Sequence, residues 1–169
     1  MKIIVVDRRR ITVLLLCLLI VATLAFIFGN SVKSKSESGE LSHGIADFVQ
    51  SIVDPDGRID RDSFHTFIRK LAHFVEFGLL GAELVLLRCL LCGRLLGVGV
   101  FSIAFSLLAV ANVDEFIQSF TGRGSLVSDV LIDFSGGACG AAAAALAIHI
   151  VIGLKRRAAE RSDSSGDRK

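Results

Sequence analysis

Nine polar or charged residues could carry chemistry in this chain, because they stand at the ends of strongly apolar segments. They are Lys70, His73, Glu76, Asp114, Glu115, Gln118, Arg123, Asp129 and Asp133. Imidazole and carboxyl groups serve as general acids and bases, whereas lysine and arginine bind anionic groups. These residue types therefore favour a site that binds an anion and moves a proton.

The spacing of these residues predicts that sequence neighbours share helix faces. Lys70, His73 and Glu76 follow one another at intervals of three residues, so they form a stripe about 9 Å long on an α-helix. Two further pairs are four residues apart, Asp114 with Gln118 and Asp129 with Asp133. Each of the three groups thus needs a helix to position it.

Four apolar segments can supply these helices. They are Ile11–Phe28, Leu71–Leu91, Leu95–Val113 and Val130–Leu154. A helix needs about 20 apolar residues to cross a bilayer, and the mean hydropathy of +0.63 with a single proline argues against a soluble domain. We predict an all-α membrane protein, a bundle of four transmembrane helices. The first segment is expected to remain as a span, because its apolar run is longer than a signal-peptide core.

Basic residues predict the orientation of this bundle, since Lys and Arg beside a span resist translocation. With the N-terminus inside, the cytoplasmic segments carry most of the 19 Lys and Arg residues. We therefore expect residues 1–10 and the charged tail 155–169 to be cytoplasmic and to flank a four-span membrane domain over residues 11–154. The nine polar residues then lie near the extracytoplasmic face.

Two connections between the spans are informative. Residues 92–94 form a tight turn, so the second and third spans should pack antiparallel. In the long connection, Leu41–Val53 has apolar residues at helical spacing, which predicts a short amphipathic extracytoplasmic helix in the membrane interface. Asp62 and Ser63 then offer an N-cap for a helix that continues into the second span.

The predicted topology brings all nine polar residues to one membrane face. Taken singly, each has a structural interpretation: Lys70 can anchor at headgroups, and Asp129 can cap a helix. Ionisable groups at this depth are costly unless paired or hydrated, so we expect a wet cleft where the second, third and fourth spans meet, with the first span peripheral. Because clustered carboxylates repel one another, Lys70, Arg123 or a metal ion should contact them.

A divalent metal ion is one variant of this site. Asp114, Glu115, Asp129 and Asp133 would supply hard oxygen ligands for Mg²⁺ or Ca²⁺. His73 would in addition admit Mn²⁺ or Zn²⁺, whose ligands include imidazole. The residue types leave the occupancy and identity of the metal open.

Two further features concern packing. Glu83 lies deep in the second span and is expected to be a neutral acid bonded to the third span, through Ser102 or Ser106. On the fourth span, Gly136 and Gly140 have the spacing of small residues that lets helix backbones approach closely.

Three sequence blocks resemble the VanZ-like family. They are Arg69-Lys70-Leu71-Ala72-His73-Phe74 with Glu76-Phe77, Asp114-Glu115 with Gln118-Ser119-Phe120 and Gly122-Arg123, and Asp129-Val130-Leu131-Ile132-Asp133 followed by Gly136. Their order and spacing match the family over residues 26–145, with Phe77 where tyrosine is frequent and Thr121 where proline is frequent. The resemblance implies a small bacterial membrane protein, associated through the founding member with teicoplanin resistance.

Two functions from different classes remain open. In the first, the protein processes or binds a lipid-linked cell-wall precursor or a phospholipid. The catalytic candidates are then His73, Glu76, Asp114 and Glu115, and the substrate-binding candidates are Lys70, Gln118, Arg123, Asp129 and Asp133. In the second, a non-enzymatic protein binds an envelope ligand or a partner protein and reduces access of the drug. Both place the protein in the bacterial cell membrane, with the lipid bilayer as a partner and no nucleic acid.

Overall fold

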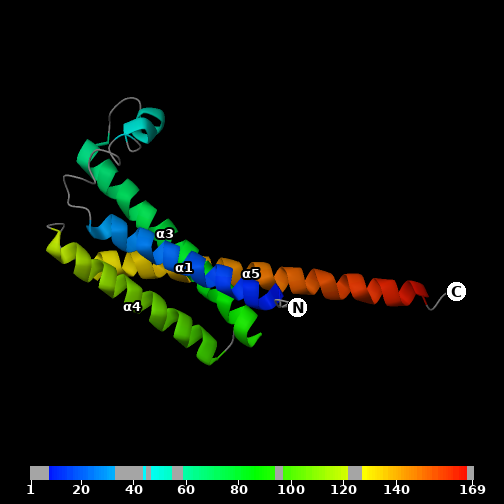
Figure 1. The fold of residues 1–169 in the computed structure, drawn as a ribbon. Helices are drawn as coiled ribbons and strands as arrows, with labels where there is room; N and C mark the ends of the chain where they lie inside the picture. Colours follow the sequence, from blue (N-terminus) through cyan, green and yellow to red (C-terminus); the bar gives the residue numbers. More distant parts are fainter. Residues whose placement is uncertain are drawn as a thin grey trace, which may run out of the picture.

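The structure of the chain, a computed structural model, describes residues 8–32, 44, 47–54, 59–93, 97–121 and 127–166, with side chains up to residue 158. Within these ranges the fold is helical, as the sequence predicts (Figure 1). The long helices are α1 (Arg8–Val32), α3 (Arg61–Cys92), α4 (Val98–Phe120) and α5 (Val127–Gly166). A short helix over residues 47–53 precedes α3.

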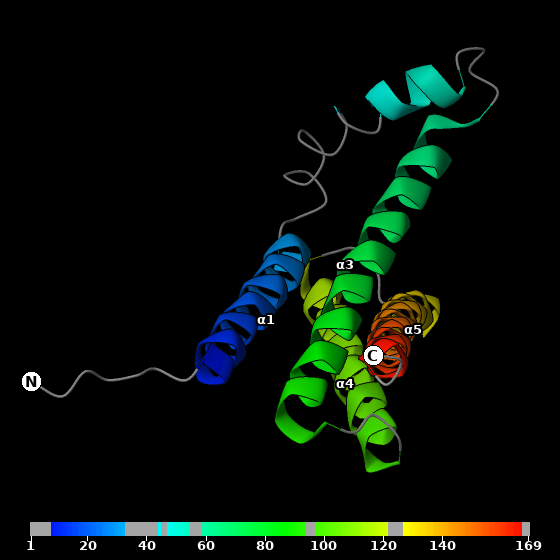
Figure 2. The ribbon, with the colours of Figure 1, turned by 90° about the vertical axis from the view of Figure 1, so that its right-hand side faces the viewer.

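Contacts at the helix ends show how the chain runs through the bundle. At one end, the Nε and Nη2 atoms of Arg9 donate hydrogen bonds to the carbonyl oxygen of Leu90, at 3.0 and 2.7 Å, so the start of α1 lies beside the end of α3. At the other end, the Thr121 hydroxyl lies 3.3 Å from the Ser31 carbonyl oxygen, so α1 and α4 finish together. Helices α1 and α4 thus run opposite to α3 and α5 (Figures 1 and 2).

Glycines bring α3 and α5 into backbone contact. A Cβ atom added at these glycines would overlap a backbone carbonyl of the facing helix: Gly136 with Phe74, Gly140 with Gly78, and Gly81 with Gly137. The predicted close approach at Gly136 and Gly140 is therefore confirmed. On the other side of α5, Gly137 faces the Leu107 side chain of α4, so α5 is held between two helices.

The buried apolar core joins α1 to the other helices. Ile27 of α1 is fully buried together with Phe77 and Leu80 of α3 and Leu107 and Ala111 of α4. The expectation of a peripheral first span is therefore wrong. Helix α1 packs into the bundle because the segment, which the prediction treated as uniformly apolar, carries polar residues that form hydrogen bonds to other helices. These residues are Thr23, Asn30 and Ser31.

Three of the described helices are long and apolar enough to cross a membrane: α1, α4, and α5 up to Ala158. Their outward faces carry large exposed apolar side chains, among them Leu14, Phe101, Phe105 and Leu146. Helix α3 contains Glu76, Glu83 and Arg88 and is not one of these candidate spans. Three of the four predicted spans are thus supported by length and composition, and the α3 span stays a prediction.

The start of α3 differs slightly from the expected one. The N-cap is Asp60, whose side chain accepts a hydrogen bond from the Ser63 backbone N–H at 3.1 Å, instead of Asp62 or Ser63. The helix ends at Cys92, and its C-cap is Gly93, which has φ +64°, a left-handed conformation that glycine adopts without a steric penalty. The turn between α3 and α4 therefore begins at Gly93, and Arg94 lies outside the described residues.

An ion cluster ties the short helix to the start of α3. Asp47 pairs with Arg61 and lies 3.0 Å from His65 Nε2. The hydrogen bond from Arg61, followed by that from His65, lowers the pKa of Asp47 from its ordinary value. Only the end of the amphipathic helix predicted for Leu41–Val53 lies among the described residues, where Phe48, Ile52 and Val53 are exposed. Its position in the membrane interface stays a prediction.

Candidate functional site

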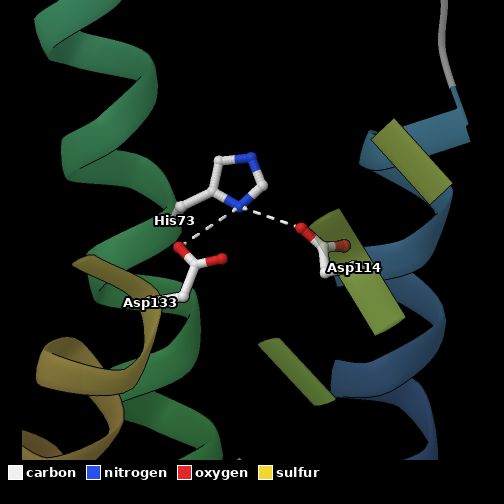
Figure 3. Close-up of side chains that lie close together, drawn as sticks. All are labelled: His73, Asp114 and Asp133. Atoms are coloured by element: carbon white, nitrogen blue, oxygen red, sulfur yellow. Dashed lines mark ion pairs between the residues drawn. The ribbon is translucent and has the colours of Figure 1, made fainter. Parts of the chain in front are cut away.

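The centre of the site is formed by one residue from each of three helices. His73 comes from α3, Asp114 from α4 and Asp133 from α5, and the three side chains point toward one another (Figure 3). The His73 Nδ1 atom lies 3.7 Å from Asp114 Oδ2 and 3.9 Å from Asp133 Oδ1. The three residues are only 8%, 0% and 2% exposed. Residues that are far apart in sequence thus share one buried site.

Asp114 is held on both carboxylate oxygens. The Ser31 hydroxyl donates to Oδ1 at 2.6 Å, and the Gln118 amide donates to Oδ2 at 2.6 Å. Hydrogen bonds to a charged acceptor are short and stronger than neutral ones. Two donors at these distances fix the orientation of the Asp114 carboxylate toward His73.

The last turn of α1 contributes two side chains to the site that the sequence did not assign a role. Besides Ser31, the Asn30 amide donates a hydrogen bond to Glu76 Oε1 at 3.2 Å. The second oxygen of Glu76 is buried and has no hydrogen-bond partner within the described part of the chain. The sequence did contain a signal for this role, since two adjacent polar residues at the end of an apolar helix are expected to face protein or headgroups and not lipid.

A half-buried ion pair borders the site. The Lys70 ammonium nitrogen lies 2.7 Å from Asp129 Oδ1, so α3 and α5 are also joined by charge. This contact confirms the expectation that Lys70 lies against the acids. A small pocket borders both this pair and the buried centre. It is lined by Arg69, Lys70, His73, Gln118, Asp129, Ile132 and Asp133.

Two predicted site residues remain, Glu115 and Arg123. Glu115 is 4% exposed and lies on α4, next to Asp114 in sequence. Arg123 lies outside the described residues, so its predicted contact with the acids stays a prediction. The structure therefore brings five predicted residues to one pocket: Lys70, His73, Gln118, Asp129 and Asp133. Asp114 is hydrogen-bonded to Gln118 of this pocket, and Glu76 is hydrogen-bonded to Asn30 of α1.

The buried acid Glu83 has a different partner from the expected one. Its Oε1 atom accepts a hydrogen bond from the Thr23 hydroxyl of α1 at 2.9 Å. Ser102 and Ser106 instead donate to backbone carbonyls of their own helix, at Gly99 and Ser102. The prediction of a bond from Glu83 to α4 is wrong, because serine side chains in helices often satisfy themselves on the preceding turn.

Fold and site together define a helical membrane protein with a polar centre buried between its helices. The chain belongs to the VanZ/LLP1 family, whose family model matches residues 11–149. No curated protein and no solved structure matches the chain. The resemblance of the three sequence blocks to the VanZ-like family is thereby confirmed.

Proposed function

We propose that this protein binds the anionic group of a lipid-linked cell-wall precursor or of a phospholipid in the bacterial cell membrane, and that it thereby lowers susceptibility to teicoplanin. The observation that carries the proposal is the small pocket, in which the two cations Arg69 and Lys70 lie beside the buried His73. The acids Asp129 and Asp133 line the same pocket, and Lys70 is paired with Asp129. In this proposal, the phosphate or carboxylate of the ligand binds to the two cations, and a bond next to that group lies beside the imidazole of His73.

Each residue of the pocket has a separate task in this proposal. Lys70 has three N–H donors and gives one to Asp129, so others can bind an incoming anion. His73 is the catalytic candidate for proton transfer, since imidazole changes charge near neutral pH. Asp114 is fully buried and already bonded by Ser31 and Gln118, so it acts as a positioning residue for His73.

Non-enzymatic binding is the second candidate function, and the hydrogen bonds of the acids favour it. Neutral donors occupy Asp114 and one oxygen of Glu76, which is typical of groups that hold helices together. In that case the protein would bind an envelope ligand or a partner protein without changing it. The catalytic roles of Glu76 and Glu115 belong to the first candidate alone.

The orientation of the protein is part of the proposal. The contact of Arg9 with Leu90 puts the N-terminal arginines at the same end as the turn at Gly93, which suits a cytoplasmic end rich in basic residues. We expect reporter fusions after Cys92 and after Ala158 to be cytoplasmic, and a fusion after Thr121 to be extracytoplasmic. A cytoplasmic reporter after Thr121 would place the pocket inside the cell and remove the extracytoplasmic assignment.

The functional proposal is tested by drug susceptibility in a sensitive bacterial host. We expect expression of the protein to raise the inhibitory concentration of teicoplanin more than that of vancomycin. Lys70→Gln and His73→Gln should each lower the inhibitory concentration of teicoplanin to that of cells without the protein. The first variant loses the anion-binding charge, and the second loses the proton-transfer group. Membrane levels of each variant are measured by immunoblot.

Matched controls lie at the other end of α5. Lys155→Gln and His149→Gln remove the same side chains from exposed positions, and both should leave the effect intact. Loss of the effect in Lys70→Gln alone would favour binding without proton transfer. An unchanged inhibitory concentration with the wild-type protein present in the membrane would contradict the proposed function.

A further inference from the structure

We propose that His73, Asp114 and Asp133 form a binding site for one divalent transition-metal ion such as Mn²⁺ or Zn²⁺. The proposal deepens the proposed function and rests on it for the chemistry of the site. With the ion bound, His73 would serve as a ligand and not as the proton-transfer group. The sequence alone suggested four acids with His73 as an additional ligand, whereas this donor set omits Glu115 and Asp129. Its three donors come from three different helices (Figure 3).

The distances between the donor atoms suit a single ion. One ligand atom from each residue lies within 4.8 Å of the other two, and His73 Nδ1 is 3.7 and 3.9 Å from the two carboxylate oxygens. Ligands that each lie about 2.1 Å from one metal are roughly 3.0 to 3.5 Å apart. The two distances from His73 would need to shorten by a few tenths of an ångström, and the distance between the two carboxylate oxygens, which is at most 4.8 Å, by up to roughly 1.5 Å.

Charge gives a second, independent argument for a cation. Two aspartates are almost completely buried here, and within the described ranges their ion pairs are with His73. Burial of charged carboxylates is costly unless an opposite charge is close. Lys70 compensates Asp129 at 2.7 Å and is not paired with either buried aspartate. A divalent ion would neutralise both carboxylates at once.

The surroundings of the donors resemble the outer shell of a metal site. Ser31 and Gln118 each hold one oxygen of Asp114, and groups of this kind orient metal ligands and tune their affinity. Asp129 pairs with Lys70 through Oδ1 and is not among the three donors that lie close together. A mixed set of one imidazole and two carboxylates favours Mn²⁺ or Zn²⁺ over Mg²⁺ and Ca²⁺, which prefer oxygen alone.

Three protein ligands leave coordination positions for a ligand from outside. Lys70, His73 and Asp133 line the same pocket, so an anion bound by Lys70 would lie beside the ion. A bound ion would act as a Lewis acid toward a phosphoryl or carbonyl oxygen. The substrate class implied is thus an oxyanion that both a lysine and a metal can bind.

The test measures metal in the purified full-length protein in detergent. We expect elemental analysis to give about one Mn or Zn per chain after incubation with the metal and removal of the excess. His73→Gln, Asp114→Asn and Asp133→Asn should each contain at least tenfold less. The matched control His149→Gln should keep the metal, because His149 is exposed and lies at the far end of α5.

A second measurement covers variants that fold poorly. Adding the metal should raise the melting temperature of chelator-treated wild-type protein in a concentration-dependent way, because a ligand that binds only the folded state stabilises it. Asp133→Asn should melt at the same temperature with and without metal. A wild-type protein that neither retains the metal nor melts higher in its presence would overturn the proposal, as would a metal content equal to that of the wild-type protein in all three donor variants.

These outcomes are separable from those of the drug test. Stoichiometric metal in a protein without effect on teicoplanin would support the metal site and count against the proposed function. A drug effect that depends on Lys70 and His73 in a protein that binds no metal would do the reverse.

Discussion

Replacing Gly140 with alanine should destabilise the protein strongly, whereas the same replacement at Gly29 should be neutral or stabilising. A Cβ atom at position 140 would overlap the carbonyl group of Gly78, and a backbone carbonyl cannot rotate away as a side chain can. Overpacking of a tight interface costs about 1–3 kcal/mol, and a backbone clash belongs at the upper end. This cost exceeds the gain of about 1 kcal/mol that alanine brings to a helix.

The measurement is the free energy of unfolding of the purified protein in detergent, or its melting temperature. Gly29 is the matched control, because a Cβ atom added there meets nothing within 4 Å and only the helix propensity changes. The two substitutions are chemically identical, so opposite signs would isolate the contact between α3 and α5. Equal stability of the two variants would contradict the backbone approach at Gly140.

The second large effect is expected at the junction of α1 with the site. Ser31→Ala removes the hydroxyl that donates to Asp114 Oδ1, so this buried oxygen loses its donor. A hydrogen bond to a charged group contributes about 1.5–3 kcal/mol, and an unsatisfied buried acceptor carries its own penalty. We therefore expect a loss of roughly 2 kcal/mol in the free energy of unfolding.

A double-mutant cycle with Asp114→Asn isolates this interaction. The asparagine amide is neutral, so loss of a donor to its oxygen is less unfavourable than loss of a donor to a carboxylate. Ser31→Ala should therefore lower the free energy of unfolding by about 1 kcal/mol less in that background. Ser135→Ala is the control, because Ser135 is exposed and its hydroxyl donates to the Ile132 carbonyl of its own helix. If Ser31→Ala and Ser135→Ala had equal and small effects, α1 would not be anchored through the site.

Much of the candidate site was predictable from local spacing. The intervals between Lys70, His73 and Glu76 place them on one stripe of any α-helix, because the rise and rotation per residue are constant. Hydropathy located α1, α4 and α5, since the apolar run of each is long enough for a bilayer. Both inferences depend only on helix geometry and on residue type.

The error about α1 shows where this reasoning stops. Thr23, Asn30 and Ser31 are spaced within an apolar helix, and hydropathy averages them into the surrounding segment. Their side chains instead bond to Glu83, Glu76 and Asp114. The rotation of α1 about its own axis decides whether these residues face lipid or protein, and that rotation depends on the packing of Ile27 against the other helices.

The sequence by itself determined the helices, the three apolar spans and the polar residues that share each helix face, because these follow from short-range periodicity. The tertiary structure decided which acid meets which partner: Lys70 with Asp129, and Asp114 and Asp133 with His73. Partner choice depends on how helices cross. That crossing is set by backbone contacts such as Gly140 against Gly78, which join residues far apart in the chain.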